Sequence, residues 1–263
     1  MSINGVALGQ GRPGMGKAYA GHRKRRGASP TKIIGQRARR QNARLLEILT
    51  PDNGKEAPAF HQGIALFDFS GIDKGLQGYY WNFPSVVQGQ RVMNRGIFDS
   101  RIHPGLPKVP LKPLFQQTLL ERGCQLDDYP LQGFPIHGFD LQETFSLPRI
   151  LLAGDAAGVD PLLGEGVSFA LAYGDAASNS IIEAFHRQDF RFQEYSRQIL
   201  SHPILQQLRA RAKIARWVYT FSHSPRLLPW IWKLTPLFFR GLTWYRPQYV
   251  PVNHPRIFRI DVD

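Results

Sequence analysis

Residues 149–171 constrain the fold of this chain more than any other stretch. A short apolar run leads into the pair Gly154-Asp155, a glycine-rich loop follows, and small and apolar residues then continue to Arg187, about seven helical turns from Gly164. This order predicts a buried strand over 148–155, a tight turn, and a long buried helix over 164–187. A strand, a glycine loop and a helix in that order are typical of α/β proteins.

The residue types in this stretch also predict a ligand. Asp155, at the end of the expected strand, can accept hydrogen bonds from hydroxyl groups. Gly164 and Gly166 leave the first turn of the helix open, so its unpaired N–H groups and partial positive charge can face an electron-rich ring or a phosphate. Glycine also lets a flat ligand approach the backbone closely. We therefore expect a site for a ligand that combines hydroxyls with a planar ring.

Composition excludes several other classes of protein. The chain has 263 residues and one cysteine, Cys124, so a disulfide scaffold and a multi-cysteine metal site are excluded. No apolar run reaches the ~18 residues that a membrane-spanning helix needs. The first residues lack the apolar core of a secretory signal. We expect a cytoplasmic protein, soluble or peripheral on a membrane, and the spacing of His, Cys and carboxylates predicts no metal site.

The net charge of +13 is concentrated at the two ends. Residues 1–50 carry a net charge of +10, residues 51–190 carry −6, and residues 191–263 carry +9. An evenly basic surface would favour nucleic acid as a partner. The separation of charge instead indicates an acidic domain between two basic ends, which argues against nucleic acid.

Hydrophobic periodicity predicts several further elements. A weakly amphipathic helix is expected over 31–49, and a helix over 111–122 is expected to stop at Gly123. Aromatic and β-branched runs bounded by Gly, Pro, Asp or Ser predict strands over 64–69, 78–83, 92–98 and 131–139. Pro84 is expected to end the second of these strands.

The stretch from Arg149 to Leu171 closely resembles the second flavin-binding motif of the hydroxylase-type, glutathione-reductase-like FAD-dependent oxidoreductases. The matching order is Gly-Asp-Ala-Ala-Gly, two residues, Pro, two residues, and Gly-Glu-Gly. The resemblance implies FAD as the cofactor, with Asp155 on the ribityl chain. The remaining cofactor-binding residues that it implies lie in the same turn and beside the flavin ring: Gly154, Ala156, Pro161, Gly164, Glu165 and Gly166. The same stretch could also be an ordinary buried strand, turn and helix.

A narrower resemblance is to the geranylgeranyl reductase branch of this group. The run Gly78-Tyr-Tyr-Trp-Asn-Phe-Pro84 is similar to that branch's aromatic strand, which lines a long apolar pocket. The resemblance implies substrate-binding roles for Tyr79, Trp81, Phe83 and Pro84. An aromatic strand that fills a protein core is the alternative.

The beginning of the chain departs from the family pattern. A full member starts with a strand, a Gly-x-Gly-x-x-Gly loop and a helix, followed by an acidic residue for the ribose. Gly9-Gln-Gly-Arg-Pro-Gly14 has the glycines, but no acidic residue occurs before Glu47. We interpret this match as a coincidence. The chain therefore looks like the C-terminal part of such a flavoprotein without the N-terminal Rossmann unit, and we expect it to bind FAD weakly or not at all by itself. A partner chain could supply the missing unit.

The predicted fold is thus α/β, a partial FAD-binding domain with an attached, mostly antiparallel β substrate domain and C-terminal helices. Residues 1–30 are expected to be basic, glycine-rich and disordered. Residues 31–147 form the expected substrate domain of a helix and a β-sheet, and 148–190 the second half of the flavin-binding domain. Residues 191–263 form the expected basic and aromatic helical region.

The predicted function is that of an FAD-dependent oxidoreductase of the geranylgeranyl reductase type. The flavin would deliver hydride to a carbon–carbon double bond of an apolar, isoprenoid substrate, and a proton would go to the neighbouring carbon. The proton donor is not assigned: Cys124 is interpreted as structural, and His137 ends a strand near the expected cofactor site. The alternatives are a flavin monooxygenase or halogenase on the same scaffold, and a non-catalytic remnant or subunit of a split flavoprotein.

The C-terminal region predicts contact with a membrane surface. Basic residues precede or alternate with large aromatic ones, and such side chains suit the boundary between headgroups and acyl chains. The basic residues are Arg209, Arg211, Lys213, Arg216, Lys233 and Arg240. The aromatic residues are Trp217, Tyr219, Phe221, Trp230, Trp232, Phe238, Phe239 and Trp244. Packing of these aromatic residues against the parent domain or another chain is the alternative.

Overall fold

The computed structural model describes residues 42–52, 54, 57–221 and 257–261. These residues divide into two compact units, each of which is described by itself. The sheet unit comprises residues 44–135 together with the described residues from Arg216 onward. The helical unit comprises Ile136–Ala215 together with Asn42 and Ala43. The expected disordered segment 1–30, with the glycines Gly9–Gly14, lies outside the described residues, as does the part of the expected C-terminal helical region over 222–256. That part includes Trp230, Trp232, Lys233, Phe238, Phe239, Arg240 and Trp244.

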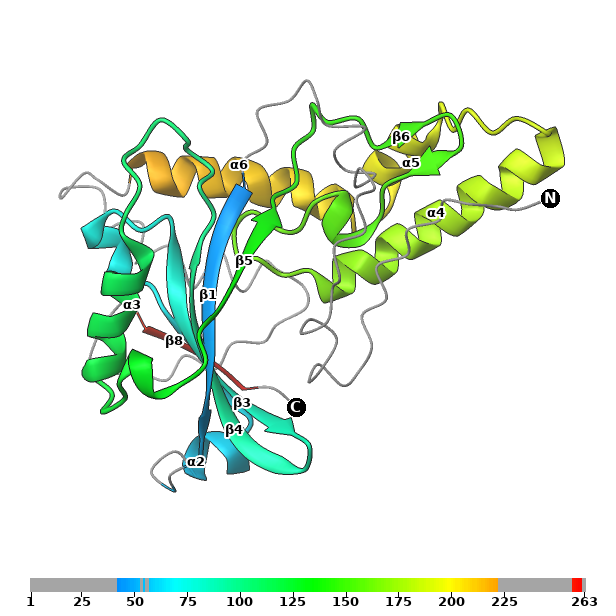
Figure 1. Cartoon of the computed structure of the whole chain (residues 1–263). Coiled ribbons are helices and arrows are strands. Elements are labelled where there is room, and N and C mark those ends of the chain that lie inside the picture. The colour runs from blue at the N-terminus through cyan, green and yellow to red at the C-terminus, as the bar shows by residue number, and fades with distance from the viewer. Residues whose placement is uncertain (1–41, 53, 55–56, 222–256, 262–263) are drawn as a thin grey trace. The chain divides into compact units, whose positions relative to one another are not determined.

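A mostly antiparallel six-stranded sheet, in the order β5-β1-β4-β3-β2-β8, organises the sheet unit (Figure 1). Its strands are β1 (Asn42–Pro51), β2 (Ile64–Asp68), β3 (Gly78–Val87), β4 (Gln90–Asp99), β5 (Gln132–His137) and β8 (Ile257–Asp261). The hairpin between β3 and β4 turns at Gln88 and Gly89, whose φ angles are 53° and 79°. Two consecutive positive φ angles match the twist of antiparallel strands in a tight hairpin.

Short helices accompany the sheet: α2 (Ala57–His61), η1 (Ser70–Lys74), α3 (Leu111–Leu120) and η2 (Leu126–Asp128). The apolar face of α3 packs against one face of the sheet. Their shared core includes Ile48, Leu76, Tyr80, Ile97, Leu114, Phe115, Leu119 and Cys124. Alternation along β3 places Tyr79, Trp81 and Phe83 on the opposite face of the sheet.

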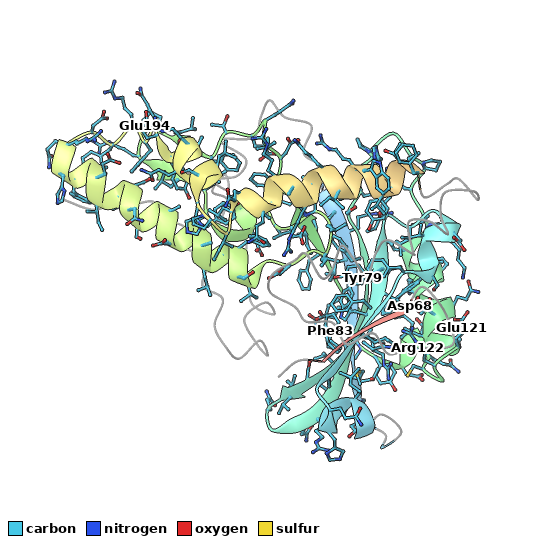
Figure 2. All side chains as sticks on the ribbon, turned by 180° about the vertical axis from the view of Figure 1, so that it is seen from behind. Asp68, Tyr79, Phe83, Glu121, Arg122 and Glu194 are labelled. Atoms are coloured by element: carbon cyan, nitrogen blue, oxygen red, sulfur yellow. The ribbon has the colours of Figure 1, made fainter. Side chains whose placement is uncertain are left out.

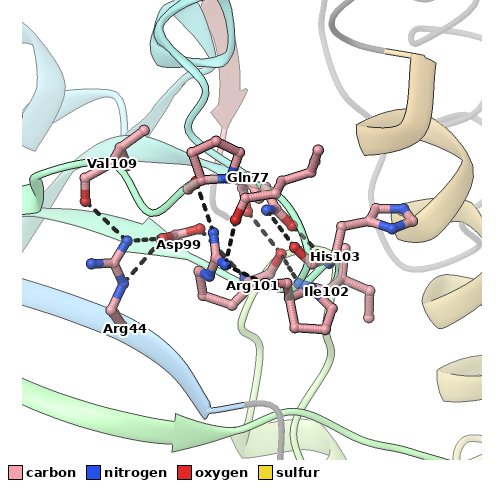
Figure 3. Close-up of polar contacts among 11 residues, drawn as sticks. Arg44, Gln77, Asp99, Arg101, Ile102, His103 and Val109 are labelled. Atoms are coloured by element: carbon pink, nitrogen blue, oxygen red, sulfur yellow. Dashed lines mark hydrogen bonds and ion pairs between the residues drawn. The ribbon is translucent and has the colours of Figure 1, made fainter.

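A polar network fixes the loop that follows β4 (Figure 3). The buried Arg101, at a φ of 52°, donates hydrogen bonds to three carbonyls of its own loop, those of Pro104, Leu106 and Pro107. Gln77 exchanges two hydrogen bonds with the backbone of His103, at 2.8 and 3.0 Å. Because these hydrogen bonds, from Arg101 within the loop and from Gln77 outside it, satisfy polar backbone groups of the loop, the chain can cross from β4 to α3 without regular structure.

The helical unit contains β6 (Ser146–Leu147), β7 (Ile150–Leu151), η3 (Gly154–Ala156), α4 (Val167–Arg187), α5 (Tyr195–Ser201) and the beginning of α6 (Gln206–Phe221). Small residues on one side of α4 pack on aromatic and aliphatic side chains from the other segments. This core includes Phe139, Phe145, Leu152, Phe169, Ala172, Tyr173, Ala176, Tyr195, Ile199, Leu205 and Leu208. Tyr195 also donates a 2.7 Å hydrogen bond to the carbonyl of Leu152 and so links α5 to the segment that precedes η3.

The predicted fold class is confirmed: the chain is mixed α/β, with a mostly antiparallel sheet and helices toward the C-terminus. The helix over 111–122 is confirmed as α3, and Gly123 follows it at a φ of 72°. Strands occur where 64–69, 92–98 and 131–139 predicted them. Within 191–263, expected to be helical, residues 257–261 form β8 and pair with β2.

Three local predictions are wrong, each for a physical reason. The helix expected over 31–49 is strand β1 from Asn42 on, because its apolar residues pair across to β4. Pro84 does not end β3. The pairing of β3 with β2 stops at Asn82, so the N–H that proline lacks is not needed on that side of the strand. The strand expected over 148–155 is two residues long, because Arg149, at a φ of 66°, turns the chain between β6 and β7.

The contact between Gly96 and Trp81 generates a prediction on stability. A Cβ atom at Gly96 would lie 2.0 Å from the Trp81 ring, so Gly96→Ala must displace a buried indole. We expect the free energy of unfolding to fall by about 1–3 kcal/mol, measured by urea denaturation. Gly105→Ala is the control, because a Cβ there meets no atom within 4 Å. Equal stability of the two variants would contradict the packing described here.

Candidate functional site

The loop between β7 and α4 holds all of the predicted cofactor-binding residues in one compact turn. Gly154 and Gly164 have φ angles of 56° and 69°, which L side chains rarely adopt. Gly164 donates its N–H to the carbonyl of Asp160 at 2.9 Å, and Asp160 donates its N–H to the carbonyl of Glu165 at 3.1 Å. These bonds close the loop on itself, and α4 therefore begins at Val167 rather than at Gly164.

The middle of the loop lies against the end of β5. The carbonyl of His137 accepts the N–H of Val159 at 2.9 Å, and Phe139 returns a bond of the same length to the Val159 carbonyl. A Cβ atom at Gly158, whose φ is 114°, would lie 2.6 Å from Cα of Phe139. Only glycine permits this approach, so Gly158 belongs with the loop glycines although the sequence analysis did not single it out.

Asp155 is the available carboxylate of the loop. Its side chain is exposed and has no hydrogen-bond or ion-pair partner among the residues that the structure describes. Partial desolvation by the surrounding loop raises its pKa. A Cβ atom at Gly166 would come within 3.1 Å of Asp155 Oδ1, so the glycine leaves room for this carboxylate beside the start of α4.

The other two carboxylates of the loop are already engaged. Asp160 is fully buried: Oδ1 accepts the N–H of Leu162 at 2.8 Å, and Oδ2 accepts Nη1 of Arg211 at 2.7 Å. Oε2 of Glu165 accepts the same Nη1 at 2.9 Å, and Oε1 accepts the Ser168 hydroxyl. Every oxygen of these two carboxylates therefore has a partner, in contrast to Asp155.

Besides Gly158, the sequence analysis missed Arg211 and Asp160 as site residues. Burial alone lowers the pKa of Arg211, but its two carboxylate partners raise the pKa above the usual value. Burial raises the pKa of Asp160, and Arg211 opposes that shift. We expected Arg211 to meet lipid headgroups, and this is wrong, since its side chain is 3% exposed and paired inside the helical unit. The buried Tyr219, 1% exposed, is likewise no membrane contact.

The beginning of α4 faces the loop with free N–H groups. Gly166 is the N-cap and offers no side chain to the first turn, and no acidic residue occurs in that turn. A 21-residue helix with an uncapped N-terminus presents donors and a partial positive charge. The Asp155 carboxylate can accept hydrogen bonds from hydroxyls, and the N–H groups at the start of α4 can donate to an electron-rich ring. The loop therefore fits the ribityl and ring half of a flavin.

The aromatic strand forms a packed ladder of rings on one face of the sheet. The Phe67 ring lies 5.2 Å from that of Tyr79 and 4.9 Å from that of Phe83, centroid to centroid. Tyr79 and Trp81 are each 5% exposed, and Phe83 is half-buried. Figure 2 shows Tyr79 and Phe83 on β3. The ladder gives Tyr79 and Trp81 a role in the core and leaves Phe83 as the accessible ring.

Polar contacts fix Trp81, and the alternation of β3 separates Pro84 from the ladder. Trp81 donates Nε1–H to Asn94 at 2.7 Å, and Asn94 in turn donates to Glu47 at 3.2 Å. Burial raises the pKa of Glu47. Pro84 lies on the other face of the sheet, with Tyr80 and Asn82.

His137 and Cys124 have clear places. Nε2 of His137 lies 2.7 Å from Oε2 of Glu143, and both side chains are mostly buried. The His137 ring is therefore paired with a carboxylate, while the backbone carbonyl of the same residue accepts a hydrogen bond from Val159 of the cofactor loop. Cys124 is buried in the sheet unit's core beside α3, in line with a structural role. Within the described residues, no group of three or more His, Cys, Asp or Glu side chains is placed to hold a metal ion.

Comparison with known proteins finds partial matches. No family model matches the chain. Over 111 residues it is 32% identical to Protein FixC of Salmonella typhi and equally to Protein FixC of Salmonella typhimurium. The match covers 40% of this chain and 25% of each FixC protein, so the chain spans only a part of the curated relatives.

A solved structure matches more of the chain at lower identity. It is a geranylgeranyl bacteriochlorophyll reductase-like protein from Thermoplasma acidophilum, with a TM-score of 0.49 and 18% identity. The match covers 82% of this chain and 57% of that protein.

The free carboxylate generates a prediction on flavin affinity. Asp155→Ala removes the one unpaired carboxylate of the loop, and a lost hydrogen bond to a charged group weakens binding roughly 10- to 100-fold. Riboflavin is the sharper probe, because it contains the ring and ribityl chain without the ADP half. We expect quenching titrations to show this loss for riboflavin and FAD alike. Asp175→Ala, on the exposed side of α4, is the control. Unchanged affinity in Asp155→Ala would remove the residue from the site.

Proposed function

We propose that the chain is the ring-binding part of an FAD-dependent oxidoreductase of the geranylgeranyl reductase type. The observation that carries the proposal is the free Asp155 carboxylate beside the uncapped start of α4, in a loop whose other carboxylates are paired. A carboxylate suits ribityl hydroxyls, and free backbone N–H groups suit the electron-rich edge of a flavin ring.

Each part of the loop would have a defined task. Asp155 would accept hydrogen bonds from the ribityl chain, and Gly154 and Ala156 would shape the turn that presents it. Pro161, Gly164, Glu165 and Gly166 would pack along the ring, where glycines allow close approach. When bound, FAD would supply hydride chemistry, and the protein would bind and orient it and exclude water.

The substrate that we propose is an apolar isoprenoid chain with a carbon–carbon double bond. This part of the proposal rests on the aromatic strand. Phe83, half-buried at one end of the ring ladder, would contact the chain directly, while Tyr79 and Trp81 would support it from the same face of the sheet. Rigid aromatic surfaces bind apolar chains at low entropic cost.

The first experiment tests cofactor binding by the chain, independently of any substrate. We expect the chain alone to bind riboflavin measurably and to gain little from the ADP half of FAD, because residues 1–30 lack a credible fingerprint for it. Titrations followed by flavin absorbance compare the two ligands. No binding of either ligand would contradict the cofactor assignment and favour a non-catalytic remnant. A chain that binds FAD firmly only with a second polypeptide would support a split flavoprotein, with that partner supplying the Rossmann unit.

Product analysis separates the catalytic alternatives. With reduced flavin and geranylgeranyl diphosphate, we expect a product heavier by two hydrogens per reduced double bond, measured by mass spectrometry. A small aromatic substrate with oxygen is the comparison. A product heavier by one oxygen there, with no change in the isoprenoid, would favour a monooxygenase instead.

We also propose peripheral membrane contact at a cytoplasmic surface, through exposed residues of α6. Arg216, Trp217 and Phe221 are exposed on the part of α6 that belongs to the sheet unit, and the Trp217 and Phe221 rings lie 5.5 Å apart. Arg209 and Lys213 are exposed on the part that belongs to the helical unit. Exposed basic and aromatic side chains on a helix suit anionic lipid surfaces. Among the described helices, none has the length and apolar character to cross a bilayer.

The membrane proposal predicts salt-sensitive binding to vesicles. We expect the chain to sediment with phosphatidylserine-containing liposomes and to be released at high salt, because screening weakens the contacts of Arg209 and Lys213. At low salt, Trp217→Ala should bind to the same liposomes in a smaller fraction than the unmodified chain. Leu171→Ala, an exposed apolar residue of α4, is the matched control. Equal recovery in the supernatant with and without lipid would contradict the membrane proposal. It would favour packing of these aromatic residues against protein instead.

A further inference from the structure

A single buried arginine connects α6 to the cofactor loop. Arg211, on α6, donates the same Nη1 to Asp160 at 2.7 Å and to Glu165 at 2.9 Å. Its guanidinium carbon lies 5.0 Å from the centre of the Phe169 ring, which is part of the first turn of α4. Three points of the helical unit thus meet at one side chain: the middle of the loop, its end, and the beginning of α4.

The arrangement leaves the loop few alternatives. Asp160 is 0% exposed and Arg211 is 3% exposed, so neither charge can be hydrated instead of paired. Removing one partner of such a pair leaves an uncompensated buried charge, which is strongly destabilising. Asp160 also accepts the N–H of Leu162 and, through its carbonyl, that of Gly164. The pair therefore fixes the backbone from Asp160 to Glu165 from both ends.

We propose that Arg211 is a positioning residue for the flavin site: it sets the geometry of the loop that presents Asp155 and the start of α4 to the ring. The inference rests on the proposed function, and goes beyond it, because it makes cofactor affinity depend on a helix that follows the loop by some forty residues. Arg211 does not contact the ligand in this assignment. It acts through Asp160 and Glu165, whose side chains hold the loop closed.

The experiment uses Arg211→Met, which keeps the apolar stem and removes the charge, and Arg211→Lys, which keeps the charge and loses the paired geometry. Arg197→Met is the control, since Arg197 is an exposed arginine of the same unit on α5. The first measurement needs no ligand: amide hydrogen exchange of Leu162 and Gly164. The second is riboflavin affinity, and the third is unfolding in urea.

We expect Arg211→Met to speed exchange at Leu162 and Gly164 at least tenfold and to weaken riboflavin binding at least tenfold. Exchange in the middle of α4 should stay within twofold, which distinguishes a local effect from general destabilisation. Arg211→Lys should recover part of the affinity, and Arg197→Met should resemble the unmodified chain.

Two results would overturn the inference. The first is a folded Arg211→Met variant whose loop amides exchange at the original rate. The second is a variant whose loop opens while riboflavin affinity stays unchanged. If Arg211→Met does not fold, Arg211→Lys and Asp160→Asn take its place in the same measurements. If the unmodified chain binds no riboflavin, the proposed function and the cofactor role of Arg211 both fail, and exchange at Leu162 and Gly164 still decides whether Arg211 holds the loop.

Discussion

The buried ion pair between Arg211 and Asp160 is the interaction on which the rest of the candidate site depends. A loop with several glycines loses much conformational freedom when it is fixed, so something must hold it in one shape. Here a charge inside the protein does so, because both partners are removed from water and neither can separate from the other at low cost. The pair also uses up the carboxylates of Asp160 and Glu165, and this leaves Asp155 alone to receive a ligand.

The sheet unit is built on a different principle. Its aromatic ladder and the α3 core stabilise it through apolar contact on both faces. Polar side chains add specific bonds that fix rings, loops and neighbouring elements. The hydrogen bond from Trp81 to Asn94 and the ion pair between Arg122 and Asp68, 2.7 Å long, are examples. Asp68, Glu121 and Arg122 lie close together in Figure 2. Burial lowers the pKa of Arg122 and Asp68 opposes that shift.

Sequence reasoning predicted the features that depend on local pattern. Strands β2, β3, β4 and β5, helix α3 and helix α4 follow from periodicity and from their flanking glycines, whereas β1 and β8 lie in segments that were expected to be helical. The compact loop around Asp155 follows from the spacing of its residues. The role of Arg211 could not be predicted in this way. On a basic amphipathic helix an arginine is normally solvated, and its partners Asp160 and Glu165 lie 51 and 46 positions away in the chain. The turn at Arg149 could not be predicted, because the residue type gives no sign that a non-glycine residue adopts a positive φ angle.

The lone cysteine has a use that follows from its place in the core. Cys124 is the single thiol of the sequence and is 6% exposed, next to the end of α3. A thiol reagent can reach it only when this core opens, so its rate of modification reports the opening of the sheet unit without any engineered label. The helical unit contains no thiol and stays silent in such an assay. The chain therefore carries an internal probe that distinguishes local opening of one unit from loosening of the other.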